Sequence, residues 1–127
     1  MDKILLNEYI SLISDSSFKL TAERLTFKSG VRADLKGCDL LAEAVILYGT
    51  ETCTAFCEIY RILGELHGQR AKSVMRSIAY AIMHAYDISA RLSDMIGVTV
   101  KATDIHNGLV ISILGRIFKN PDLAVYK

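Results

Sequence analysis

Proline, cysteine and long apolar runs are all scarce in this sequence. The one proline, Pro121, lies near the C-terminus, so no interior helix is interrupted by a proline. The three cysteines are an odd number and too few for a disulfide framework, which is compatible with reduced thiols. No apolar run approaches the roughly 18–20 residues that span a bilayer, and Asn7 and Glu8 interrupt MDKILLNEYISL, which therefore lacks a secretory layout. These absences predict a cytoplasmic protein with no membrane partner.

Net charge is also small. A formal net charge of +1 excludes a general attraction to polyanions, so any nucleic-acid affinity has to come from a local patch. Hydrophobic residues nevertheless make up 51% of the 127 residues, which is more apolar surface than so small a monomer is expected to bury. We therefore expect a homo-oligomer. The length predicts a single domain over residues 1–127.

Apolar residues recur with a helical period of about 3.6 residues along the chain, which predicts an all-α bundle of about six to seven helices. Gly49, Gly68 and Gly97 follow three of the apolar stripes, at the position where a helix ends most easily. Residues 16–29 are ambiguous. TAERL favours a helix there, whereas Phe18/Leu20 and Leu25/Phe27 alternate as in a small hairpin.

Residues 1–15 form a predicted helical extension ahead of the main domain, residues 16–118. Its apolar stripe consists of Leu5, Tyr9 and Leu12. Such a stripe either supplies contacts to a second copy of the chain or covers the core of its own monomer. The pattern leaves both roles open.

The spacing LGELHGQRAKSVMRSI predicts a helix-turn-helix. Gly64 provides the small residue where a second helix crosses closely, and Gly68, four residues later, suits the turn. Val74 and Ile78 then supply apolar anchors that point back toward the first helix. The same pattern is compatible with two ordinary amphipathic helices that carry a solvated polar face.

The outward face of the second helix carries the candidate DNA-binding residues. Between residues 61 and 76 the four cations Arg61, Arg70, Lys72 and Arg76 outweigh Glu65, which makes a local net charge of +3. An arginine bonds guanine bidentately, and further cations hold phosphates, so double-stranded DNA is the expected partner. The candidate contact residues are Gln69, Arg70, Lys72, Met75, Arg76 and Ala79.

Four segments of the chain also resemble a known family. GVRADLKGCDLLAEAV (30–45) resembles the start of the C-terminal effector domain of the stage zero sporulation protein A family, the sporulation initiation response regulators of endospore-forming Firmicutes. LGELHGQRAKSVMRSIAYAI (63–82) aligns without a gap with the helix-turn-helix of that family. MIGVTV (95–100) and HNGLVISILGRI (106–117) resemble its last two helices. Their shared order and spacing extend the resemblance over residues 16–118.

The resemblance implies a sequence-specific transcriptional regulator that binds promoter DNA as a dimer. Residues 71–86 would form the recognition helix in the major groove, and the C-terminal helix would help the subunits associate. In the family a Glu-Arg pair and a second arginine read the bases. Here Arg76 matches the arginine of the pair, while Met75 and Ala79 replace the other two and would contact thymine methyl groups. No receiver domain is expected, because too few residues precede the matching region.

The two replaced residues favour an alternative function, a protein-interaction module that has kept the fold, lost base readout and modulates a related regulator. Other functions have less support. Cys53 and Cys57 are spaced for one helix face, but a metal site needs further ligands, and such a pair is more often core. No nucleophile-base arrangement or phosphate-binding loop is present, so we expect neither an enzyme, nor a cofactor, nor a small-molecule substrate.

Overall fold

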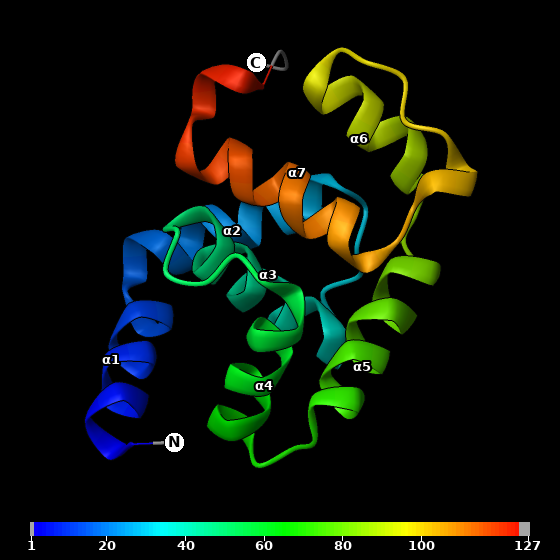
Figure 1. The fold of residues 1–127 in the computed structure, drawn as a ribbon. Helices are drawn as coiled ribbons and strands as arrows, with labels where there is room; N and C mark the ends of the chain where they lie inside the picture. Colours follow the sequence, from blue (N-terminus) through cyan, green and yellow to red (C-terminus); the bar gives the residue numbers. More distant parts are fainter. Residues whose placement is uncertain (1, 125–127) are drawn as a thin grey trace.

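The computed structural model describes residues 2–124, which form seven α-helices and two short 3₁₀ helices, η1 and η2, with no strand among them (Figure 1). The predicted all-α class with six to seven helices is therefore confirmed. Met1 and residues 125–127, which the predicted single domain includes, lie outside the described residues. The elements are α1 (Lys3–Ser14), α2 (Ser16–Lys28), α3 (Lys36–Gly49), α4 (Phe56–His67), α5 (Ala71–Met83), α6 (Ile88–Ile96), η1 (Ala102–Asp104), α7 (Asn107–Lys119) and η2 (Pro121–Leu123).

The possible hairpin in residues 16–29 is wrong, because this segment is the continuous helix α2. The carboxylate of Asp15 caps the helix by accepting the backbone N–H groups of Ser17 and Phe18, both at 3.1 Å. Ala22, Leu25 and Thr26 share one buried face at helical spacing, and the Thr26 hydroxyl donates to the carbonyl of Ala22 at 2.8 Å. The cap at Asp15 and the buried face together stabilise a helix here, in place of the strand that the alternation of Phe18 with Leu20 had suggested.

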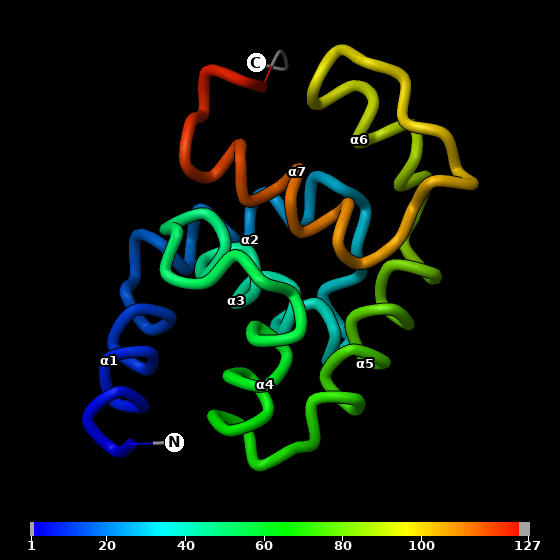
Figure 2. Tube along the Cα trace, in the orientation of Figure 1, coloured from blue at the N-terminus to red at the C-terminus, as the bar shows by residue number. Residues whose placement is uncertain are grey.

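Helix α3 lies at the centre of the bundle and packs mainly against α7, α5 and α2 (Figure 2). Ten of its fourteen residues are buried, which is typical of a helix surrounded on most sides by others. Leu41 and Leu47 are fully buried in it. The central helix thus fixes the scaffold against which α4 and α5 are placed.

Within residues 2–124, no helix has both the length and the apolar character to cross a membrane.

Helix α1 packs loosely on this scaffold. It contains no buried residue, although Tyr9, Leu12 and Ile13 contact the core from its inner side. Ile4 and Ile10 remain 71% and 43% exposed, and Leu5 is 41% exposed. The extension therefore covers the core with one face of its C-terminal half, while Ile4, Leu5 and Ile10 leave apolar side chains in solvent.

Candidate nucleic-acid interface

A tight turn joins α4 to α5, and the two helices diverge from it (Figure 1). Helix α4 ends at His67, and Gly68 adopts the left-handed conformation, with φ 65° and ψ 36°. The N–H groups of Gly68 and Gln69 both donate to the carbonyl of Gly64, the latter at 2.8 Å. This arrangement closes the end of α4 within one residue and turns the chain directly into α5.

Close approach at Gly64 is what permits the turn. A Cβ atom at this position would lie 2.6 Å from the carbonyl oxygen of Gln69, far inside van der Waals contact. Val74 and Ile78 are fully buried and pack α5 against the rest of the bundle. The predicted small residue, turn residue and anchors of a helix-turn-helix therefore occupy these roles in the fold.

The predicted contact residues lie on the outer side of α5 and its entry. Arg70, Lys72, Met75 and Arg76 are exposed, whereas Gln69 and Ala79 are half-buried. Arg70 precedes the helix in extended conformation, and its carbonyl accepts the N–H groups of Ser73 and Val74. The side chains of Arg70 and Lys72 thus stand at the N-terminal end of α5, the end that a recognition helix directs into a major groove.

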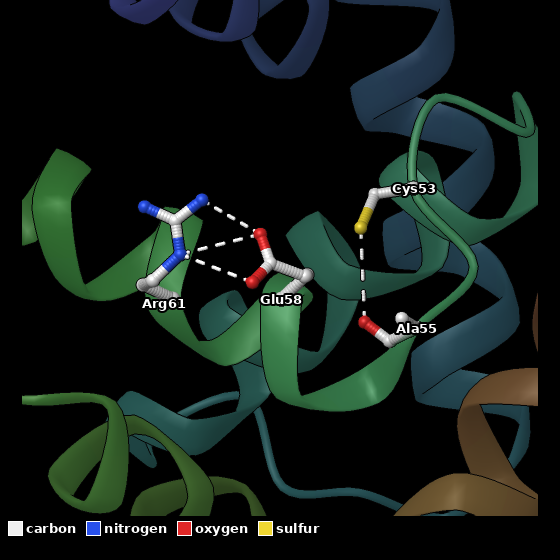
Figure 3. Close-up of polar contacts among 4 residues, drawn as sticks. All are labelled: Cys53, Ala55, Glu58 and Arg61. Atoms are coloured by element: carbon white, nitrogen blue, oxygen red, sulfur yellow. Dashed lines mark hydrogen bonds and ion pairs between the residues drawn. The ribbon is translucent and has the colours of Figure 1, made fainter.

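Arg70, Lys72 and Arg76, together the α5 cationic patch, form no ion pair within residues 2–124. Arg61, which the sequence counted with them, is instead paired with Glu58 on its own helix at 2.6 Å (Figure 3). This bond holds the pKa of the Glu58 carboxyl below its ordinary value and raises that of Arg61. The patch therefore consists of three cations rather than four.

His67 is paired with the central helix α3. Its Nε2 lies 2.5 Å from a carboxylate oxygen of Glu43 on α3. The contact ties the end of α4 to the central helix, just before the turn. His67 is therefore a packing and pairing residue of the scaffold.

Helix α5 is shorter than the predicted recognition helix of residues 71–86, because it ends at Met83. The N–H of Tyr86 donates to the carbonyl of Gly30 at 2.8 Å, and Asp87 adopts a left-handed conformation with φ 50°. This tertiary hydrogen bond ends the helical geometry of the backbone, although the apolar pattern of the sequence continues through Ala85. The candidate contact residues all lie before this end.

A groove of about 770 Å³ opens beside the outer face of α5 and is here called the α5–α7 groove. Met75, Arg76 and Ala79 line one side of it, and the segment from η1 to the start of α7 lines the other. The Asn107 side-chain amide donates to the carbonyl of Met75 at 3.0 Å and holds the two sides together. Its lining residues are Phe56, Tyr60, Met75, Arg76, Ala79, Ile82, Met83, Ile88, Ala102, Ile105, His106, Asn107 and Gly108.

The sequence does not indicate this groove, because its two sides are more than twenty residues apart in the chain. Three predicted contact residues are therefore shared between the outer face of α5 and a largely apolar hollow. No local pattern near residues 102–108 marks them as part of a site. The signal in the sequence was weak: two methionines of α5, Met75 and Met83, line the groove and are exposed in the structure.

The placement of the cysteines on one helix face is wrong, because Cys53 precedes α4. Its N–H donates to the carbonyl of Leu47, and its thiol contacts the carbonyl of Ala55 at 3.7 Å (Figure 3). Burial raises the pKa of the Cys53 thiol. Among residues 2–124, no three His, Cys, Asp or Glu side chains gather as a metal-ligand group.

The chain was also compared with known proteins. No family model matches the chain, and no significant match is found among curated proteins or solved structures. Function therefore has to be argued from the residues and their arrangement.

Proposed function

We propose that the chain is a sequence-specific transcriptional regulator of the sporulation effector type, which binds promoter DNA through α5. The observation that carries this proposal is the α5 cationic patch. In a protein of net charge +1, three exposed cations follow a tight turn, on α5 and on the residue before it, and none of them forms an ion pair within residues 2–124. Such uncommitted cations gain most from phosphates, because no intramolecular partner has to be given up.

The roles of the side chains follow from their places along α5. Arg70 and Lys72, at the helix entrance, would hold phosphates on either side of the major groove. Arg76, one turn further, would bond O6 and N7 of a guanine. Met75 and Ala79 would contact thymine methyl groups, and Gln69 would bond the backbone near the turn. We propose a cytoplasmic homodimer, since two patches related by symmetry would contact successive turns of the duplex.

Salt dependence of duplex binding tests this proposal. A pool of random-sequence duplexes would be selected on the protein, and affinity for the enriched duplex measured by fluorescence anisotropy at two salt concentrations. Two phosphate contacts per subunit predict a slope of log K against log salt of roughly −4 for a dimer. Lys72→Gln should reduce the slope by about 2, one phosphate per subunit.

Arg76→Ala tests base reading separately from phosphate binding. Loss of a bidentate guanine contact should cost about 1–3 kcal/mol on the selected duplex and much less on random duplexes. Arg24→Ala, which removes an exposed arginine on α2, is the matched control and should leave affinity unchanged. If no duplex binds even at low salt, the proposal fails.

A protein-interaction module remains the second candidate, and the exposed apolar side chains around α5 favour it. Met83, which lines the α5–α7 groove, is 74% exposed, and Tyr86, just after α5, is 68% exposed. The module would modulate a related regulator instead of reading DNA itself. Native mass spectrometry of the chain mixed with a regulator from its own host would show a defined heteromer, and DNA affinity would be lacking.

A further inference from the structure

The α5–α7 groove has the size and lining of a small-molecule site. Its volume of about 770 Å³ falls within the roughly 300–1,000 Å³ typical of ligand pockets. Phe56, Tyr60 and Ile82 contribute apolar surface, and Met75 and Met83 add flexible thioethers that adapt to a ligand's shape. Ala79 leaves space on the α5 side because its side chain is a single methyl group, whereas Gly108 lets the Phe56 ring pack closely on the α7 side.

The charge of the groove is one-sided. None of its thirteen lining residues is acidic, whereas Arg76 is cationic and forms no ion pair within residues 2–124. Helix α7 also begins at Asn107 on the groove wall, so the positive end of its dipole lies there. An apolar ligand with a single negative charge matches this lining better than a neutral or cationic one.

His106 adds a hydrogen-bond donor to the same wall. Its Nδ1 accepts the N–H of Leu109 at 3.3 Å and caps α7. A neutral imidazole that accepts at Nδ1 carries its proton at Nε2, so the other ring nitrogen is a donor. Arg76 and His106 both line the groove, so each brings an N–H donor to its wall. Arg76 also lines a smaller hollow beside Lys36 and Tyr80.

We propose that the α5–α7 groove binds an apolar monocarboxylate. The carboxylate pairs with Arg76 and the His106 donor, and the hydrocarbon tail lies between α5 and the segment that leads into α7. Because Met75, Arg76 and Ala79 are also the proposed DNA contacts, the bound molecule competes with DNA. This competition rests on the proposed function, whereas binding of the carboxylate does not.

Calorimetric titration of the full chain with decanoate, in the absence of DNA, tests the binding. Decanol has the same tail without the charge. Decanoate should bind saturably with one site per chain and about tenfold more tightly than decanol, as expected for a charge-assisted hydrogen bond. Arg76→Gln should bring the two affinities together, and Arg24→Gln on α2 should leave the difference intact.

Ala79→Phe places a ring in the groove and should abolish binding of both molecules, with circular dichroism showing that the helices are retained. Absence of saturable decanoate binding, or equal affinity for decanol, overturns the proposal. So does a change of oligomeric state in Ala79→Phe without ligand, because a second copy would then occupy the groove.

Competition is measured in a separate arm, by adding decanoate to a preformed complex with the selected duplex. The duplex should be displaced at decanoate concentrations that saturate the groove, and decanol at the same concentrations should not displace it. If decanoate binds but leaves the duplex bound, the regulatory part of the proposal is overturned. If no duplex binds at all, the proposed DNA function fails while the carboxylate titration stands unaffected.

Discussion

A methyl group at Gly64 would test directly how α4 and α5 are joined. In Gly64→Ala the added Cβ would lie 2.6 Å from the carbonyl oxygen of Gln69, a backbone atom that cannot rotate away. Relief requires the turn and the start of α5 to move, and overpacking of this kind costs about 1–3 kcal/mol. Alanine gains about 0.5–1 kcal/mol over glycine inside a helix. The net expectation is a loss of about 1–2 kcal/mol in the free energy of unfolding.

Gly68→Ala is the matched control, because nothing surrounds a Cβ there and only the backbone, with φ 65°, opposes it. The left-handed conformation costs an L-residue roughly 1–2 kcal/mol, so urea denaturation should show similar losses for the two variants. Amide NMR spectra should separate them. Gly64→Ala is expected to shift amide signals along the whole of α5, whereas Gly68→Ala shifts only those next to the turn.

A third variant checks the backbone argument. Gly68→Asn should recover most of the stability that Gly68→Ala loses, because asparagine tolerates the left-handed conformation better than alanine. The reasoning would be refuted by a Gly64→Ala protein that is more stable than the parent and has unshifted α5 amides. Such a result would mean that α4 and α5 stand far enough apart to accept a side chain, and the tight helix-turn-helix would be lost.

Three further predictions concern the scaffold. The N–H of Phe18, which donates to the Asp15 carboxylate, holds the pKa of Asp15 below its ordinary value of 3.8. The stability from this bond is therefore present above pH 3.8 and is lost as the pH falls through the lower pKa of the folded state. Asp15→Asn keeps the cap but does not titrate, so it should flatten this acid dependence of stability in urea denaturation. Burial raises the pKa of Cys38 to about 11, so iodoacetamide should alkylate exposed Cys57 long before Cys38, and prompt Cys38 labelling in peptide mass spectra would contradict its core position. Ile78→Ala should cost about 2–5 kcal/mol of unfolding free energy, against a change within about 0.5 kcal/mol for exposed Lys72→Ala.

The helical class and the α4–α5 unit were predictable because both depend on local features. Val74 and Ile78 lie one turn apart and therefore share a face wherever the helix packs. Gly68 adopts positive φ because glycine alone has no steric penalty there. The ambiguity in residues 16–29 was also local in origin, because the interpretation considered the alternation of apolar residues but not the helix cap at Asp15.

One error arose where distant segments meet, and another from the pairing of two side chains within one helix. The extra turn expected after Met83 is prevented by the bond between Tyr86 and Gly30, and the cation counted at Arg61 is neutralised by Glu58. Periodicity reports which face of a helix is apolar, but it does not report what lies against that face. Side-chain pairing within α4 likewise depends on rotamers that a pattern of residue types does not specify.

The sequence by itself determined the helices, the glycine turn and the identities of the three cations on α5, because propensity, spacing and φ preference act within a few residues. Only the tertiary structure decided that these cations form no ion pair with the other residues of 2–124, that His67 turns toward Glu43, and that α7 begins beside α5. The α5–α7 groove belongs to this second group. Its two sides are joined by the hydrogen bond from Asn107 to the backbone at Met75, a contact between residues whose separation in the chain no local pattern encodes.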